Sequence, residues 1–307
     1  MSVFDPDYDD EPDSDEELVE REKFGDGVHN TWLHVNDANK NGETELTRAA
    51  RLGLTARVTR LLAVDDIDVN VADKRGRTAL MWAVNGVRTQ FHGEFMEIAT
   101  ALLAVVGIDV NATDNHGETA LMFAAKTGHT ETTTALLAVE GINVNAANND
   151  GWTALMCAAK FGHTETVTAL SAVVGISVNN ALANDGVTAL MMAAQKDHTE
   201  MATALLAVAG IDVNAADKTG WTAMMWAAVN GYAKTVAALA GVPNLNPYVV
   251  TTVGVDYLFV GRPTLEPVTV PDGSTAMDVA NLAHRGDVAA LLKPLFSKPV
   301  KSATTAN

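Results

Sequence analysis

The sequence predicts an all-α solenoid of stacked helix-turn-helix units with protruding loop or hairpin fingers. The stretch from Gly117 to Asp150 reads as a short helix, a tight turn, a longer helix and a loop. Nearly the same sequence is repeated from Gly151 and again from Gly186, and less similar copies begin at Gly42, Gly76, Gly220 and Gly273. The starting glycines are 34, 41, 34, 35, 34 and 53 residues apart. A near-constant period of this length marks a stacked array, here with about seven units including the terminal caps.

Each unit carries its own start signals. Asp217 and Gly220 are the first and fourth residues of a type I turn. A threonine that can cap the first helix follows each turn glycine by two residues, at Thr78, Thr119, Thr153, Thr188, Thr222 and Thr275. A glutamate near the start of the second helix favours the helix dipole, at Glu131, Glu165 and Glu200. Small residues such as Ala124 and Ala125 allow neighbouring helices to approach closely.

These units resemble the ankyrin repeat family from about residue 35 to about residue 295. One copy matches the family's turn and first helix with Gly220, Thr222, Ala223, Met224, Met225, Ala227 and Ala228. Gly128-His129, Leu136-Leu137 and Asp109-Val110-Asn111 match the Gly-His pair, the leucine pair and the loop. The family's Pro is Ala from the second copy onward, and its His is replaced at Met81, Met122, Met156, Met191 and Met225. Because that His usually ties neighbouring turns together, the resemblance implies that packing supplies more of the cohesion here.

The sequence divides into three parts. Residues 1–26 hold twelve carboxylates against Arg21 and Lys23, and their low apolar content predicts a disordered acidic tail. Residues 27–296 are expected to form the repeat domain, with insertions at 85–95 and 247–272, and residues 297–307 a flexible tail. Ser14 precedes three acidic residues, a pattern that suits an acid-directed kinase.

Charge and cysteine content narrow the range of partners. The formal net charge of −17 makes the chain a poor ligand for nucleic acid or anionic membranes. No apolar run approaches the roughly 20 residues that a membrane-spanning helix needs. The single cysteine, Cys157, stands at a position that is apolar in other copies, which predicts a buried thiol rather than a reactive one. Because one cysteine cannot form an internal disulfide, we expect an intracellular protein, cytoplasmic or nuclear. We also expect a monomer.

The sequence contains no recognisable catalytic motif. A phosphate-binding glycine loop, paired cysteines, a zinc-binding HExxH and a nucleophile elbow are all missing. His129, His163 and His198 occupy equivalent positions in successive units, so they should form a column with steps of about 8–10 Å. Metal ligands lie about 2 Å from one ion, so this column cannot be a single metal site. We therefore expect no metal, no cofactor and no enzymatic activity.

The positions that differ between copies are the candidate binding residues, because loop tips and first helices line the concave face of such a stack. We single out Arg75, Arg77, Glu118, Trp152 and Trp221 around the turns, and Phe161 at the end of a first helix. Tryptophan and arginine dominate interface hot spots. In the alternative interpretation, Trp152 and Trp221 pack on the neighbouring unit. Trp82 and Trp226, directly before the alanines, are expected in the core.

The second insertion predicts a hairpin finger. It is rich in β-branched and aromatic residues between Gly and Pro, with strands expected near 248–253 and 256–260. Tyr257 and Phe259 would then contact a partner. In the alternative interpretation, the finger lies against the edge of its own stack.

These features favour a non-enzymatic scaffold or adaptor that binds another protein on its concave face. In one alternative, Asn70, Asn111 and Asn214 are targets of an asparagine hydroxylase, because their surroundings resemble the sites that such enzymes modify in the family. The same side chains can instead hold the loops by hydrogen bonds. In another alternative, the acidic tail masks the binding face by folding onto the basic first repeats. An enzyme that uses the inserted finger has no supporting residues.

Overall fold

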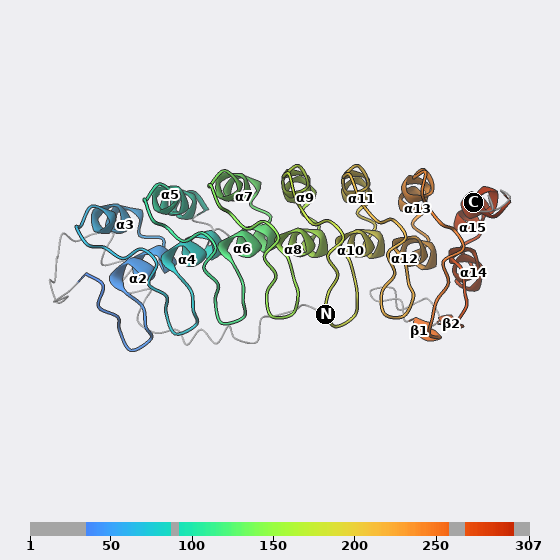
Figure 1. The fold of residues 1–307 in the computed structure, drawn as a ribbon, viewed down its shortest axis with the longest axis horizontal. Coiled ribbons are helices and arrows are strands. Elements are labelled where there is room, and N and C mark those ends of the chain that lie inside the picture. Colours follow the sequence, from blue (N-terminus) through green and yellow to red (C-terminus); the bar gives the residue numbers. More distant parts are fainter. Residues whose placement is uncertain (1–34, 87–91, 258–267, 298–307) are drawn as a thin grey trace, which may run out of the picture.

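The computed structural model describes residues 35–86, 92–257 and 268–297, and its helices form two parallel rows (Figure 1). The first row contains the first helix of each unit: α2 (Glu45–Arg51), α4 (Ala79–Gly86), α6 (Ala120–Thr127), α8 (Ala154–Phe161), α10 (Ala189–Gln195), α12 (Ala223–Asn230) and α14 (Ala276–Leu282). The second row contains α3 (Thr55–Leu62), α5 (His92–Leu103), α7 (Thr130–Leu137), α9 (Thr164–Ser171), α11 (Thr199–Leu206), α13 (Ala233–Ala240) and α15 (Gly286–Phe296). Loops project from the side of the first row that faces away from the second row. The predicted helical solenoid is therefore confirmed.

The predicted threonine caps start the first helices. The Thr119 hydroxyl accepts a hydrogen bond from the Met122 N–H at 3.3 Å, and equivalent bonds form at the other five threonines. The helix α6 ends at Gly128, whose φ is 75°, in the left-handed region. A Cβ on Gly128 would also lie 2.3 Å from Nδ1 of His163 in the next unit. Glycine is therefore required there both by the backbone and by the histidine that covers it.

The core is a continuous layer of small and flexible side chains between the two rows. Each first helix packs on the first helices of the neighbouring units, and each second helix on the neighbouring second helices. Within a unit, the first helix packs on the second. The five methionines that replace the family's histidine are all buried: Met81, Met122, Met156, Met191 and Met225. Burying one such side chain contributes about 1.5–3 kcal/mol relative to leaving it exposed. This agrees with the expectation that packing, rather than a histidine hydrogen bond, joins neighbouring turns.

A ladder of asparagine side chains ties each loop to the next one. Asn111 donates from Nδ2 to the carbonyl of Gly141 at 2.9 Å, and its Oδ1 accepts the N–H of Asn143 at 2.8 Å. The same two bonds recur at five other positions: Asn36, Asn70, Asn145, Asn179 and Asn214. We call these six residues the asparagine ladder. Because both amide atoms of each rung are used, the rung fixes the spacing between consecutive units.

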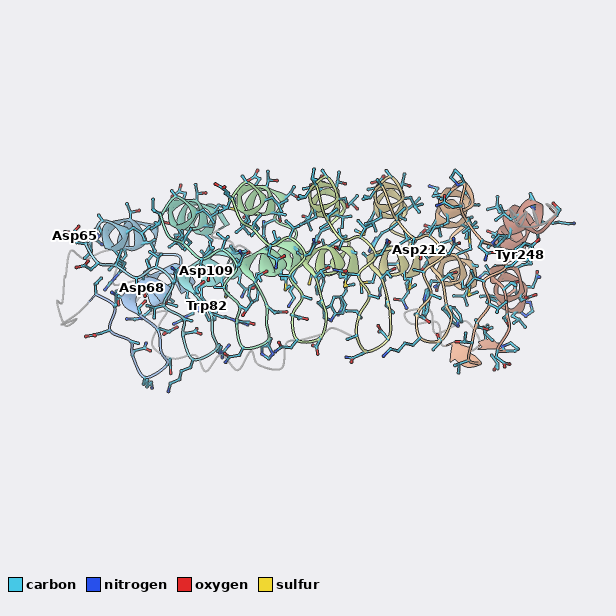
Figure 2. The ribbon with its side chains drawn as sticks, in the orientation of Figure 1. Asp65, Asp68, Trp82, Asp109, Asp212 and Tyr248 are labelled. Carbon is cyan, nitrogen blue, oxygen red and sulfur yellow. The ribbon has the colours of Figure 1, made fainter. Side chains whose placement is uncertain are left out.

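The last unit ends the stack with polar residues. Asp278 and Asn281 in α14 are exposed, whereas Met156 and Ala159 at the equivalent positions of α8 are buried against a neighbouring unit. A terminal repeat needs such a face because nothing covers it. At the same end, Tyr248 packs edge-on against Phe296 of α15, with 5.3 Å between the ring centroids (Figure 2). None of the described helices has both the length and the apolar composition that crossing a bilayer requires.

The inserted segment enters the stack within a β-turn. The Thr252 N–H donates to the carbonyl of Thr219 at 2.9 Å, just as the Lys218 N–H donates to Asp185 in the preceding unit. The Gly273 N–H donates to the carbonyl of Thr251, in the way that Gly220 donates to Asp217. Thr251 and Thr252 therefore replace the first two residues of an ordinary turn. Residues 253–272 stand where the preceding turn has one residue, Thr219.

This placement corrects the predicted hairpin. The expected strand at 248–253 is wrong, because Thr251 and Thr252 make the backbone bonds of the turn. The strands are β1 (Val255–Tyr257) and β2 (Val268–Val270), which pair antiparallel with Val255 opposite Val270. The prediction for 256–260 overlaps β1, and its remaining residues, with Phe259, lie outside the described ranges. The finger is therefore a continuation of the last turn rather than a separate element.

Candidate functional site

The residue after each turn glycine forms a row along the stack, which we call the variable column. Its members are Glu43, Arg77, Glu118, Trp152, Val187, Trp221 and Ser274. The first residue of the turn positions most of them: Oδ1 of Asp114, for example, accepts the N–H of Glu118 at 2.9 Å. The N–H of Val187 donates instead to Oδ1 of Asp185 at 3.1 Å. The capping threonine follows directly, so the side chain before it lies against the first helices. Four members of this column, Arg77, Glu118, Trp152 and Trp221, are predicted from the sequence to contact a partner.

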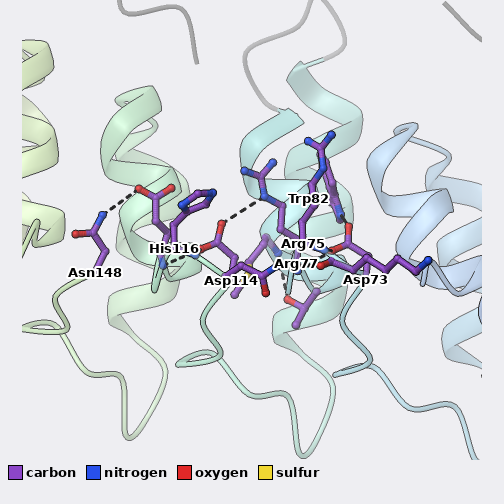
Figure 3. A network of polar contacts seen from close by, with 12 residues as sticks. Asp73, Arg75, Arg77, Trp82, Asp114, His116 and Asn148 are labelled. Atoms are coloured by element: carbon purple, nitrogen blue, oxygen red, sulfur yellow. Dashed lines mark hydrogen bonds and ion pairs between the residues drawn. The ribbon is translucent and has the colours of Figure 1, made fainter. Parts of the chain in front are cut away.

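Arg77 is a correction to that prediction, because its side chain is built into the stack. The residue is 8% exposed, and its Nε lies 3.5 Å from Oδ2 of Asp114 (Figure 3). Its guanidinium carbon lies 4.9 Å from the ring centroid of Trp82 and 5.1 Å from that of Phe123. The guanidinium therefore links its own unit to the next one and is not presented to a partner.

Glu118 is a second correction of the same kind. It is 8% exposed, and its carboxylate pairs with the ammonium of Lys126, eight residues further along the same unit. It also accepts a hydrogen bond from Nδ2 of Asn148 at 3.3 Å. The change from Arg77 to Glu118 between neighbouring copies is therefore compensated inside the stack, where each of these two side chains has a charged partner.

The tryptophans reverse the expected assignment. Trp221 is 1% exposed and its ring centroid lies 4.6 Å from that of Trp226, so the prediction of an exposed contact residue is wrong. Trp226, expected in the core, is only partly buried. Trp82 is also partly buried, and its indole N–H donates to Oδ2 of Asp73 at 2.9 Å. Trp221 is buried because the turn brings this residue of the variable column inward, over the first helix. Trp82 and Trp226 share a helix position that is buried at Phe123, Cys157 and Met192 in other units, and only part of each indole reaches the surface.

Trp152 and Phe161 remain accessible and frame a lysine. Trp152 is half-buried, and the ammonium of Lys160 lies 4.3 Å from its ring centroid. Phe161 is 49% exposed, and the same ammonium lies 5.8 Å from its ring. Phe161 also stacks on His163 at 6.4 Å. We call Trp152, Lys160 and Phe161 the aromatic–lysine cluster. It combines an exposed apolar surface with a charge that is held in place.

Arg75 lies at the tip of its turn with its side chain in solvent. Its N–H donates to Oδ1 of Asp73 at 2.8 Å, and its carbonyl accepts the N–H of Asn115 at 2.9 Å. Only the backbone of Arg75 is therefore committed to the fold. The structure places Tyr257 in β1 but does not describe its side chain, and Ser14 and the acidic tail lie outside the described ranges.

The candidate hydroxylation residues are rungs of the asparagine ladder. Asn70, Asn111 and Asn214 each use both amide atoms to hold the next loop. These bonds support the loop-holding role that sequence analysis gives as the alternative to modification. Hydroxylation itself stays a prediction.

The histidine column and the cysteine have structural surroundings. His163 packs over Gly128, and its Nε2 lies 3.1 Å from the carbonyl oxygen of Lys126. Cys157 is buried in α8, and burial raises the pKa of its thiol to about 12. A thiol that stays protonated is a poor nucleophile. In the part of the chain that the structure describes, no three His, Cys, Asp or Glu side chains gather as a metal site requires.

Sequence analysis missed the relationship between Trp152 and Lys160. The signal is a spacing of eight residues: Glu43 and Arg51 form one such pair, and Glu118 and Lys126 form another. Eight residues are slightly more than two helical turns, so the two residues lie on the same side of the helix. Helical side chains lean toward the N-terminus, so a long Lys or Arg side chain can reach the residue that precedes the cap. Trp152 and Lys160 have the same spacing.

Comparisons with known proteins agree with this architecture. A family model of ankyrin repeats, three copies long, matches residues 24–114, 87–181 and 172–248. The crystal structure of EF0377, an ankyrin repeat protein, is similar, with a TM-score of 0.57 and 28% identity over 64% of this chain and 96% of that chain. The ankyrin repeat domain of Bcl-3 is similar in fold, with a TM-score of 0.65 and 23% identity over 83% of this chain and 100% of that chain. No curated protein sequence gives a significant match. The motifs, the two-row stack and the family match together show that this chain belongs to the ankyrin repeat family.

Proposed function

We propose that this protein is a non-enzymatic scaffold that binds a partner protein through the aromatic–lysine cluster on its first-helix side. Ankyrin repeats generally mediate protein–protein interaction, and the chain matches their family model over most of its length. A standard interface buries about 1,200–2,000 Å² in total. A stack of this length offers enough surface beside the cluster for such an interface.

The exposed ring of Phe161 is the observation that carries this proposal. At 49% exposure it is a large apolar side chain in solvent, and the half-buried ring of Trp152 contacts the same lysine ammonium. Aromatic residues that lie at the centre of an interface contribute most of its binding energy. The stack itself does not need Phe161 exposed, because the equivalent positions hold Thr127, Lys196 and Asn230.

An affinity purification with quantitative mass spectrometry tests the proposal. The wild-type chain is compared with the Trp152→Ala/Phe161→Ala double variant. The matched control is Val106→Ala/Val174→Ala, which removes two fully exposed apolar side chains from the loops that follow the second helices. A partner should be retained by the wild type and the control and lost from the aromatic variant. Direct titration of the purified partner should then show a loss of roughly 1–3 kcal/mol in binding free energy. Equal retention by all three proteins would contradict the proposal.

Regulation by the acidic tail is a second candidate, favoured by exposed basic residues near the first turns. Lys74 and Arg75 are exposed, and no carboxylate among the described residues pairs with either side chain. We propose that residues 1–26, with a net charge of −10, compete with acidic partners for this region. Deleting residues 1–26 should raise the affinity for an acidic partner at low salt, and the gain should vanish at high salt. An unchanged affinity after deletion would rule out this masking.

A further inference from the structure

We propose that the aromatic–lysine cluster recognises an acidic segment of the partner, in which a carboxylate lies beside an apolar side chain. This inference rests on the proposed function and names the chemistry of the ligand for the same surface. Its basis is a comparison of equivalent positions along the stack.

Two units carry an internal ion pair at these positions. In the first unit, Nε of Arg51 lies 2.7 Å from the carboxylate of Glu43. In the third unit, the ammonium of Lys126 pairs with the carboxylate of Glu118. In both cases the glutamate belongs to the variable column, and the cation follows eight residues later near the end of the first helix.

The fourth unit keeps the cation and lacks the carboxylate. Trp152 stands where Glu118 stands in the preceding unit, and Lys160 takes the place of Lys126. Lys160 is exposed, and its described contacts are with the rings of Trp152 and Phe161. No carboxylate among the described residues lies within ion-pair distance of it. The unit therefore presents a positive charge that is available to a carboxylate from another molecule.

The surroundings of Lys160 decide what kind of ligand fits. A solvent-exposed ion pair strengthens binding by no more than about fivefold, so a carboxylate alone would bind weakly. The ring of Phe161 next to the ammonium adds apolar surface that a neighbouring side chain of the ligand can cover. A ligand that supplies both groups gains from both contacts. The two rings also hold the ammonium in place before binding, which lowers the entropy lost on forming the pair.

A second cation suggests how the segment runs. Lys196, at the end of α10 in the next unit, is exposed and has no carboxylate partner in the described ranges. Helices α8 and α10 are direct neighbours in the stack. Packed helices lie about 8–10 Å apart, and an extended chain advances about 3.3 Å per residue. An extended ligand that crosses both helices would therefore place acidic residues about three positions apart.

Selection from a random peptide library tests this inference on the full-length protein. Five proteins are used: the wild type, Lys160→Gln, Trp152→Glu, Phe161→Ala and the control Lys234→Gln, which removes an exposed lysine from the start of α13. Trp152→Glu restores in this unit the internal ion pair of Glu118 and Lys126. Peptides selected by the wild type and the control should be enriched in Asp or Glu next to an apolar residue. Lys160→Gln and Trp152→Glu should both remove that enrichment.

Binding of one synthetic selected peptide then gives the magnitude. Both cluster variants should weaken its binding about threefold to tenfold, whereas Lys234→Gln should change it less than about twofold. Replacing the acidic residue of the peptide by its amide should produce the same loss with wild type and none with Lys160→Gln. If Trp152→Glu fails to fold, as judged by its thermal melt, Lys160→Gln alone carries the test.

The outcomes separate this inference from the proposed function. Peptides that depend on Phe161 but show no acidic enrichment would overturn the acidic ligand and leave the protein-binding surface intact. Selected peptides that bind every variant of Trp152, Lys160 and Phe161 equally would overturn both. Acidic enrichment that survives Lys160→Gln would place the recognition of the carboxylate elsewhere and would also overturn the inference.

Discussion

The Nε atom of Arg77 lies 3.5 Å from Oδ2 of Asp114, which belongs to the next repeat unit. The Asp114 side chain is 0% exposed, and its other oxygen, Oδ1, accepts the N–H groups of His116 and Glu118 at 2.9 Å each. One buried carboxylate therefore closes a turn in its own unit and holds the guanidinium of the unit before it.

Asp114→Ala should destabilise the protein by about 3 kcal/mol, because it leaves a buried charge on Arg77 and two backbone donors without acceptors. Asp114→Asn should cost less, about 1–2 kcal/mol, since the amide oxygen can still accept both N–H groups. Asn148 already does this at the equivalent position of the next unit. Urea unfolding of the two variants measures the difference. Equal losses for both would show that the two backbone hydrogen bonds contribute nothing beyond the ion pair with Arg77.

Trp221→Ala and Phe161→Ala should have opposite consequences. Removing the buried indole of Trp221 leaves a cavity between units and should destabilise the fold by about 3–5 kcal/mol. Phe161 is largely exposed, so its removal should change stability by no more than about 0.5 kcal/mol. Thermal melts of the two variants test this contrast. A large loss of stability in Phe161→Ala would mean that this ring is a packing residue.

Asp66→Gly should stabilise the protein. Asp66 has a φ of 62°, in the left-handed region, at the loop position where Gly107, Gly141, Gly175 and Gly210 stand in other units. Glycine relieves the backbone strain, but it also makes the unfolded chain more flexible, which costs part of that gain. The free energy of unfolding should therefore rise by about 0.5–1 kcal/mol. Chemical denaturation measures it.

Asp197 provides the matched contrast to Asp66, since its φ is 60° in the place of Gly128 and Gly162. Its carboxylate accepts hydrogen bonds from the hydroxyls of Thr199 at 3.3 Å and Thr235 at 3.0 Å. Loss of these bonds offsets the relief of strain, so Asp197→Gly should give no gain. A gain as large as that of Asp66→Gly would show that the two hydrogen bonds contribute little.

His198 should make the fold less stable in mild acid. Partial burial lowers the pKa of His198 below its ordinary value of 6.5, and the nearby Lys196 ammonium lowers it further, against the opposing effect of Asp197. The unfolded chain therefore binds a proton more readily than the folded one. Stability from this residue is complete above about pH 6.5 and decreases as the pH falls through that value.

Urea midpoints at neutral pH and at about pH 5 test this dependence. The decrease in stability should be smaller in His198→Gln than in the wild type, because the other titrating groups are common to both proteins. An identical pH dependence would exclude His198 as a contributor.

The repeated sequence predicts the fold well because residues such as helix caps and small core residues have the same role in every unit. Thr119 caps its helix and Ala124 is buried, as their positions in the copy indicate. The exposure of the variable column is harder to predict. Arg77 and Trp221 look like surface residues in sequence, and only the packing of two neighbouring units shows that they are buried.

The site could be predicted in part for the same reason. Phe161 was expected to be exposed because its helix ends there, and it is. The role of Lys160 is harder to predict, because it appears only when units are compared in the structure. Arg51 and Lys126 at the equivalent positions pair with a glutamate, whereas Lys160 lies beside a tryptophan. The strand positions in the last finger were missed because Thr251 resembles a strand residue in sequence, whereas its hydroxyl replaces a turn carboxylate by accepting the N–H of Ser274 at 3.0 Å.

The turn that opens between Thr252 and Gly273 indicates where this scaffold tolerates added length. The Thr252 N–H keeps its bond to Thr219 of the neighbouring turn, and the Gly273 N–H keeps its bond to Thr251 across the turn, although residues 253–272 lie between Thr252 and Gly273. Length added at a turn tip is thus decoupled from helix packing. A foreign loop grafted between Lys218 and Gly220 would enter at the corresponding place, which makes the tips of the fingers the natural sites for displaying peptides or reporters on this protein.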